Sequence, residues 1–202
     1  MMGCESSLHW CSDMALVPVD IWTISLNDPH PAILTPQESA RAARFHFEQD
    51  RVHWIAAHSV LRSILAEYLK MPPLDISFTS GARGKPALVN AALEFNLSHS
   101  RGWAMVAVCL TTQVGIDLEA IRENVDIAKL LARTGETDLP AGATALFQRW
   151  TERESRTKAA GSPLLQQPDA GILSVPVKAP AGFAASVALV NALPHPNYCG
   201  NV

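Results

Sequence analysis

The sequence predicts an α+β protein built from two similar halves. Two segments with helical periodicity, roughly 49–70 and 145–160, are accompanied by short segments that alternate as β-strands do. The 202 residues suffice for one generous domain or two small ones. With 48% hydrophobic and 17% charged residues, the chain is neither disordered nor collagen-like nor a coiled coil. The division falls near 111–113, so the halves span 15–111 and 112–195.

The first half begins with an alternating, β-branched segment at 17–25, which predicts a strand. Thr35, Pro36 and Glu38 then form the capping pattern that starts a helix. The longer helix at 49–70 has apolar residues at spacings of three and four, and Pro72 and Pro73 end it. The remaining strands of this half are predicted at 74–79, 93–97 and 103–110, with an exposed loop at 80–86.

The second half opens with a strand at 114–119, followed by a short helix at 126–133. A helical period returns at 145–160 and stops at Gly161, a typical C-terminal residue. Closing strands are predicted at 172–177 and 183–190. We expect residues 1–14 and 196–202 to be mobile tails.

Charge and cysteine content exclude several classes of protein. The net charge of −3 and isoelectric point of 6.1 give no basic surplus for nucleic acid or an anionic membrane. The longest apolar runs are far shorter than the ~20 residues that a membrane helix requires. The four cysteines have neither CxxC spacing nor a dense disulfide pattern, which favours the reducing cytoplasm.

The hexapeptide Val114-Gly-Ile-Asp-Leu-Glu119 is the sharpest local feature. In a strand, its apolar residues point into a core while Asp117 and Glu119 share the opposite face. Two neighbouring carboxylates repel unless a cation neutralises them, and oxygen ligands suit Mg²⁺ or Mn²⁺. Gly115 on that face is expected to leave room for a ligand. The alternative is an ordinary solvated strand face.

The helix at 147–158 carries a second candidate pair. Phe147, Trp150, Glu154 and Lys158 follow each other at three- and four-residue steps, so they line one stripe. The acid and the base therefore lie at the edge of the core. The alternative is a surface ion pair of little energetic weight.

Three further segments could bind an anion. In Phe95-Asn-Leu-Ser-His-Ser100, Ser98 and His99 can contact a phosphate. A serine nucleophile with a histidine base is the poorer interpretation, because adjacent strand residues point apart and no G-x-S-x-G elbow is present. Lys85 is a lone cation in the loop, and Arg44 and His53 belong to a basic helical side that could equally be solvated.

The order of these motifs is more specific than any one of them. A Gly-Lys-Pro loop, FNLSHS, VGIDLE and then W-x-x-x-E-x-x-x-K-A-x-G resemble the 4′-phosphopantetheinyl transferases of the broad-specificity, surfactin-synthetase type, over roughly 36–161. The resemblance implies a pseudo-two-fold arrangement of the halves with the active site between them. It also implies Mg²⁺-dependent transfer of the phosphopantetheine arm of coenzyme A to a serine of an acyl or peptidyl carrier protein, releasing 3′,5′-ADP.

The resemblance also implies roles for individual residues. Asp117, Glu119 and Glu154 correspond to the metal ligands, and Glu154 is the expected base for the carrier serine. Lys158 corresponds to the lysine that faces the pyrophosphate. The expected coenzyme A-binding residues are Arg44, His53, Lys85, Ser98, His99 and Lys158. On the long helix, His53 and His58 stand where many relatives carry arginines, and His58 is expected to lie too far along the helix to reach the ligand.

Two other functions remain open from the sequence. A metal-dependent phosphohydrolase acting on coenzyme A or a nucleotide would release product without a carrier protein. A non-catalytic module that binds coenzyme A or a carrier protein would not need Glu154. The leading hypothesis is the transferase, a cytoplasmic monomer serving fatty acid, polyketide or nonribosomal peptide biosynthesis.

Overall fold

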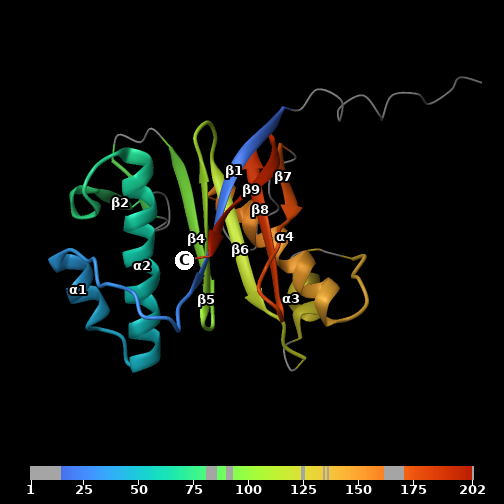
Figure 1. Ribbon diagram of the computed structural model, residues 1–202. Coiled ribbons are helices and arrows are strands. Elements are labelled where there is room, and N and C mark those ends of the chain that lie inside the picture. The colour runs from blue at the N-terminus through green and yellow to red at the C-terminus, as the bar shows by residue number, and fades with distance from the viewer. Residues whose placement is uncertain are drawn as a thin grey trace, which may run out of the picture.

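In the computed structural model the protein has four layers, in the order helix, sheet, sheet, helix (Figure 1). The structure describes residues 15–80, 86–89, 93–123, 126–133, 135, 137–161 and 171–201. The outer helices are α2 (Glu48–Leu69) and α4 (Ala143–Ala160). Between them lie a four-stranded sheet of order β4-β5-β1-β9 and a three-stranded sheet of order β6-β8-β7.

The strands and the smaller helices follow the predicted order. The strands of the larger sheet are β1 (Leu16–Ser25), β4 (Glu94–Ser100), β5 (Trp103–Cys109) and β9 (Leu193–Asn201). Those of the smaller sheet are β6 (Val114–Ala120), β7 (Ile172–Pro176) and β8 (Phe183–Val190). A hairpin of β2 (Phe78–Ser80) and β3 (Pro86–Leu88), a 3₁₀ turn (Pro73–Asp75), α1 (Pro36–Ala42) and α3 (Ile127–Arg133) complete the described elements.

The helix boundaries have the expected local causes. Thr35 caps α1, with Glu38 bonding back to the Thr35 backbone and hydroxyl, so the predicted capping box is confirmed. The long helix α2 ends at a left-handed Lys70, just before the two prolines. None of the helices within the described ranges is long and apolar enough to cross a membrane.

Strict alternation along the strands builds two cores. In β1 and β5, Ile24, Ala104 and Val106 face α2, where they pack against Leu61 and Leu65. Their neighbours on the opposite face, among them Ile21 and Met105, pack against Ile116 and Leu118 of β6 and Val187 of β8. The larger sheet is therefore buried on both faces. Where the two sheets pack together, the edge strand β4 lies beside β6.

Two expectations from the sequence are wrong: one concerns the C-terminal tail and the other the start of a strand. Residues 196–201 are not a mobile tail, because β9 pairs in parallel with β1 over most of its length. Pro194 and Pro196 lack backbone N–H groups, which suits a strand at the edge of a sheet. The predicted strand at 74–79 begins only at Phe78, because a 3₁₀ turn starting at Pro73 precedes it. The predicted tail at 1–14 lies outside the described residues.

Candidate active site

The two carboxylates of β6 lie on one face of the strand, as predicted. Val114, Ile116 and Leu118 point into the core between the sheets, so Asp117 and Glu119 face the opposite way, toward α4. Asp117 is only 4% exposed, which rules out the solvated strand face as an account of this residue. A carboxylate buried to this degree requires compensation by nearby cations or hydrogen-bond donors.

Gly115 has a different role from the one expected. A Cβ at this position would lie 2.1 Å from the Ser155 carbonyl oxygen and 2.4 Å from the Ala159 nitrogen. The backbone of α4 therefore fills the space that was expected to admit a ligand. This close approach of helix and strand brings the Glu154–Lys158 turn next to Asp117.

Lys158 is the main partner of Asp117. Its Nζ lies 2.6 Å from Asp117 Oδ1, 3.0 Å from Ser98 Oγ and 3.2 Å from the Ile116 carbonyl oxygen. The predicted stripe on α4 is confirmed, with Phe147 and Trp150 buried. Glu154 is 8% exposed and does not form the surface ion pair considered above.

The second carboxylate of β6 is held at the edge of this cluster. Ser100 Oγ donates to Glu119 Oε2 at 3.2 Å, and Arg122 Nη2 lies 3.6 Å from the same oxygen. Arg122 also lies over the ring of Phe147, which anchors it against α4. Asp117, Glu119, Glu154 and Lys158 together with these partners are hereafter called the acid centre.

Electrostatics show that the acids of this centre act on one another. Burial raises the pKa of Glu154 to about 7, and the charges of Asp117 and Glu119 add to this, against opposing effects of Lys158 and Arg153. Burial, followed by the charge of Asp117, also raises the pKa of Glu119. Asp117 therefore lies close enough to Glu119 and Glu154 to disfavour the ionisation of both glutamates.

The oxygen atoms of the acid centre have the chemistry of a Mg²⁺ site, but they are not assembled as one. Asp117 Oδ2 and Glu154 Oε1 are buried and form no hydrogen bond with any described residue. Within the described ranges, however, no three His, Cys, Asp or Glu side chains are grouped closely enough to hold a metal ion. Lys158 neutralises Asp117 in this arrangement, so a divalent cation would have to share or replace that contact.

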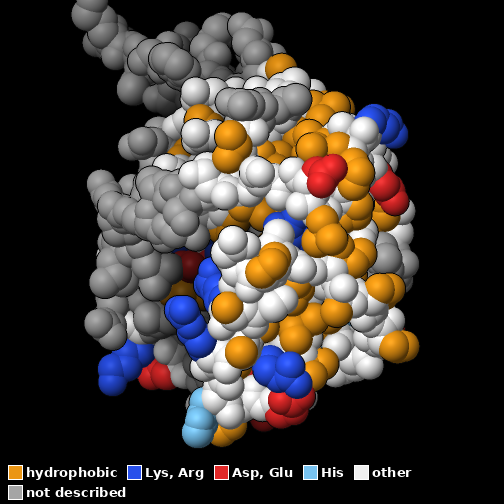
Figure 2. Space-filling model, turned by 90° about the vertical axis from the view of Figure 1, so that its left-hand side faces the viewer, with side chains coloured by type: hydrophobic (Ala, Val, Ile, Leu, Met, Phe, Trp, Pro, Cys, Tyr) orange, Lys and Arg blue, Asp and Glu red, His pale blue; other side chains and the backbone are white. Residues whose placement is uncertain are grey.

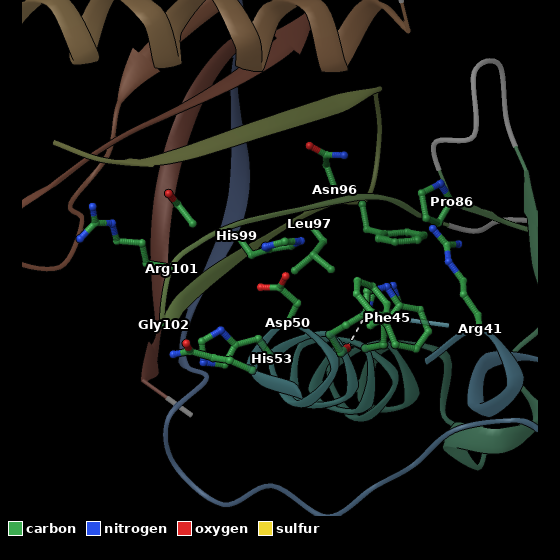
Figure 3. A pocket seen from close by; sticks show the side chains of 15 residues that line it. Arg41, Phe45, Asp50, His53, Pro86, Asn96, Leu97, His99, Arg101 and Gly102 are labelled. Atoms are coloured by element: carbon green, nitrogen blue, oxygen red, sulfur yellow. Dashed lines mark hydrogen bonds between the residues drawn. The ribbon is translucent and has the colours of Figure 1, made fainter. Parts of the chain in front are cut away.

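A basic pocket of about 970 Å³ lies on the opposite face of β4. Figure 2 looks onto this side of the molecule, where Lys and Arg side chains lie around a hollow. In Figure 3, Asp50 and His53 extend from α2 and Leu97 and His99 from β4, with Arg101 at the turn after β4. Asp50 is the one acidic residue in the described lining.

The inner wall of the pocket is formed by Trp54 and His58. The two rings stack with centroids 3.8 Å apart, and the Arg41 guanidinium lies 5.5 Å from the Trp54 ring centre. Contrary to expectation, His58 lines the pocket, whereas Arg44 is exposed and does not. Arg41, three residues earlier, is also exposed, but its guanidinium reaches the Trp54 ring and so lies in the lining.

His58 presents an acceptor to the pocket. Its Nδ1 lies 2.9 Å from the Trp54 carbonyl oxygen, which can only accept, so Nδ1 carries the proton. Burial lowers the pKa of His58 to about 4, and the ring is therefore neutral near pH 7. Nε2 is then an unprotonated acceptor, which suits an N–H or O–H group of a ligand and not a phosphate.

His53 and His99 occupy the mouth of the pocket. His53 Nε2 lies 3.2 Å from Asn27 Oδ1, and the side chain is not buried. Partial burial lowers the pKa of His99, and the positive charges of Lys158 and His53 add to the effect. Lys158 therefore acts electrostatically on His99 in the pocket as well as on the acid centre. Lys85 lies outside the described residues.

Ser98 differs from the other expected coenzyme A ligands. Its hydroxyl donates to Asp117 Oδ1 at 3.1 Å and accepts from Lys158 and from the Leu118 N–H. A hydroxyl has one hydrogen and two lone pairs, so none remains for a ligand. Sequence reasoning missed the residues Arg41, Trp54, Arg101 and Arg122. Only the basic side of the helices hinted at Arg41, and nothing local pointed to the other three.

In comparisons with known proteins, the chain matches 4′-phosphopantetheinyl transferases. The family model "4′-phosphopantetheinyl transferase, N-terminal" matches residues 23–111. The chain is 35% identical over 179 residues to the 4′-phosphopantetheinyl transferase HetI of Nostoc sp., covering 79% of this chain and 76% of HetI. It is 29% identical to a putative 4′-phosphopantetheinyl transferase of Synechocystis sp., covering 70% and 64% of the two chains. With the transferase Sfp of Bacillus subtilis it shares 25% identity, covering 68% and 65%.

Proposed function

This chain belongs to the 4′-phosphopantetheinyl transferase family, and from that premise we propose how it uses the two faces of β4. The proposed reaction moves the 4′-phosphopantetheine group of coenzyme A to a serine of an acyl or peptidyl carrier protein and releases 3′,5′-ADP. The nucleotide end of coenzyme A occupies the basic pocket, and its pyrophosphate reaches the acid centre.

One observation carries this proposal. Ser98 and His99 are neighbours in β4, yet Ser98 contacts the acid centre while His99 lines the basic pocket. A single extended ligand with several phosphates could therefore span both sites across the edge of β4. Lys158 supports this, since its charge acts on His99 on one side and on Asp117 on the other.

The chemistry requires little covalent work from the protein. The carrier serine oxygen attacks the β-phosphorus of the pyrophosphate, a new P–O bond forms, and the bond to the 3′,5′-ADP oxygen breaks. We assign Glu154 as the group that takes the serine proton; in the metal-free protein, burial raises the pKa of this carboxyl to about 7. Lys158 stabilises the negative charge that develops on the 5′-phosphate oxygen of the departing 3′,5′-ADP.

We assign the metal to the oxygens of Asp117, Glu119 and Glu154. The buried, unpartnered Asp117 Oδ2 and Glu154 Oε1 support this, because a divalent cation would relieve the mutual repulsion of the three acids. Mg²⁺, or Mn²⁺ in its place, would supply charge neutralisation for the pyrophosphate. Before it binds, Lys158 holds Asp117 in place.

For coenzyme A we propose contacts from His53, His99 and Lys158, with Arg41 added. Arg44 stays in the proposal as an outer contact, and Lys85, which lies outside the described residues, stays in it as a further cation for the phosphates. His58, as an acceptor, is suited to the amino group of the adenine. Trp54 and Phe45 supply the aromatic wall beside it.

The pseudo-two-fold division into 15–111 and 112–195 also remains a proposal. In support, each half has one long helix, α2 or α4, packed on antiparallel strands, and the acid centre lies where β4 of one half meets β6 of the other. A monomer in the cytoplasm is likewise a prediction, which light scattering and cell fractionation would check.

The decisive experiment is mass spectrometry of an apo carrier protein incubated with this chain, coenzyme A and Mg²⁺. We expect a gain of about 340 Da, the mass of the phosphopantetheine group. Asp117→Ala and Glu154→Gln should each lose at least about 100-fold in rate while remaining folded. Full activity of either variant in EDTA would remove the metal assignment. Release of 3′,5′-ADP without any carrier would favour the phosphohydrolase.

A further inference from the structure

The outer edge of β6 forms hydrogen bonds with side chains and not with another strand. In the sheet β6-β8-β7, β6 lies at the edge, where backbone N–H groups have no ladder partner. The N–H of Ile116 donates to Asn96 Oδ1 at 2.9 Å. Those of Leu118 and Ala120 donate to the hydroxyls of Ser98 and Ser100 at 3.2 and 3.1 Å.

The three side chains share one face of β4. Asn96, Ser98 and Ser100 alternate along β4 with Leu97, which packs against the core beneath α2, and with His99; Asn96 and Ser100 also border the pocket. Figure 3 shows this division, with Asn96 on the side of β4 opposite to Leu97. We call these three residues the β4 clasp.

Two members of the clasp also bind the acids. Ser98 Oγ donates to Asp117 Oδ1 at 3.1 Å, and Ser100 Oγ donates to Glu119 Oε2 at 3.2 Å. Each serine therefore holds a carboxylate and the N–H of the residue that follows it. Asn96 binds the N–H that follows Gly115, a position without a carboxylate, so it provides an internal control.

From these contacts we infer that Ser98 and Ser100 are positioning residues for the transfer reaction, fixing the Asp117 and Glu119 carboxylates for a divalent cation, while Asn96 fixes only the strand. The inference rests on the proposed function, since it concerns the same acids. Without a ligand, the Ser98 hydroxyl is fully used by contacts within the protein. Hydrogen-bond partners behind metal ligands commonly change metal affinity by 10- to 100-fold.

The test compares Ser98→Ala, Ser100→Ala and Asn96→Ala, each of which removes one bond to a β6 N–H. Binding of Mn²⁺ to the protein alone is measured by electron paramagnetic resonance, and folding by urea denaturation. We expect the two serine variants to weaken Mn²⁺ binding about tenfold. Asn96→Ala should lose comparable stability but bind Mn²⁺ within twofold of the original chain. Ser100→Thr keeps a hydroxyl and should restore binding.

Kinetics add a second readout with apo carrier and saturating coenzyme A. The serine variants should need about tenfold more Mg²⁺ for half-maximal rate, with KM for coenzyme A within twofold. Equal loss of Mn²⁺ affinity in Asn96→Ala, unchanged binding in both serine variants, or no Mn²⁺ binding by the unaltered chain would each overturn the inference. If that chain binds Mn²⁺ but transfers nothing, the proposed function fails while the clasp is still tested by binding.

Discussion

The two faces of β4 differ in how their polar groups are satisfied. In the acid centre, Lys158 and Ser98 each contact at least three atoms of other residues, and Ser100 contacts two. In the basic pocket, by contrast, the ring of His99 forms no hydrogen bond with any residue that the structure describes, and the rings of His53 and His58 form one each. The acid centre is thus held in place by contacts within the protein, while in the basic pocket the His99 ring is available to a ligand. Substitutions in the acid centre should therefore cause large losses of stability or activity, because its contacts depend on one another. Substitutions in the basic pocket should cause smaller losses.

The largest effect is expected from removing the cation of the acid centre. Lys158→Met leaves Asp117 buried without its ion-pair partner, which should lower the free energy of unfolding by about 3 kcal/mol in EDTA. Because a divalent cation can replace the lysine charge, excess Mg²⁺ should recover part of this loss. Urea denaturation with and without Mg²⁺ measures both. Lys129→Met, on the exposed face of α3, is the control, and a similar response of both variants would contradict the prediction.

A neutral residue at Glu154 should stabilise the metal-free protein while abolishing transfer. The pKa of Glu154 is raised from 4.5 to about 7, so the fold favours the protonated form. Stability is therefore full below pH 4.5 and falls as the pH rises through 7. Glu154→Gln escapes this loss and should exceed the original chain by about 3 kcal/mol at pH 8, and by nothing at pH 4.

Thermal or urea unfolding across this pH range, in EDTA, provides the measurement. The exposed Glu67→Gln on α2 is the matched control and should show no such trend. A constant difference between Glu154→Gln and the original chain at all pH values would contradict the raised pKa of Glu154.

On the pocket side, His58 predicts the opposite dependence on pH. Its folded pKa of about 4 lies below the usual 6.5, so the unfolded chain takes up the proton first as the pH falls. The original chain should lose about 1.5 kcal/mol between pH 7 and 5 relative to His58→Phe, which keeps the stacked ring. His46→Phe is the control at an exposed position. Parallel stability curves for His58→Phe and the original chain would contradict the buried, neutral ring.

The smallest effect separates the two arginines of the first helical segment. Arg41 lines the pocket beside Trp54, while Arg44 is exposed outside its described lining. Arg41→Ala should raise KM for coenzyme A about fivefold, roughly 1 kcal/mol of binding, and Arg44→Ala less than twofold. Steady-state kinetics at saturating carrier protein give both constants. A larger effect at Arg44 than at Arg41 would show that Arg44 contacts coenzyme A and would contradict the prediction.

The acid centre was more predictable than the pocket, for physical reasons. A strand repeats every two residues and a helix every 3.6, so VGIDLE and the α4 stripe fix which side chains share a face. The sequence therefore places Asp117 and Glu119 together, and Glu154 with Lys158. It does not show that the α4 backbone rests on Gly115, because that contact joins segments distant along the chain.

The pocket depends on how helices pack, which local periodicity does not determine. The basic side of the helices was visible, but only the placement of α1 decides that Arg41 and not Arg44 reaches Trp54. Likewise, nothing in the sequence shows that Asn96, Ser98 and Ser100 bind the backbone of β6. These side chains meet their partners only when the helices and the two sheets have packed together.

The parallel pairing of β9 with β1 has a consequence for synthesis in the cell. Asp20 and Asn197, which contact each other across these strands, are 177 residues apart. The larger sheet cannot close until nearly all of the described chain has left the ribosome. Until then β1 presents an unpaired edge, open to chaperones or to other nascent chains. Since β9 follows every other described element in the chain, a messenger truncated before β9 would yield a chain with that edge permanently exposed.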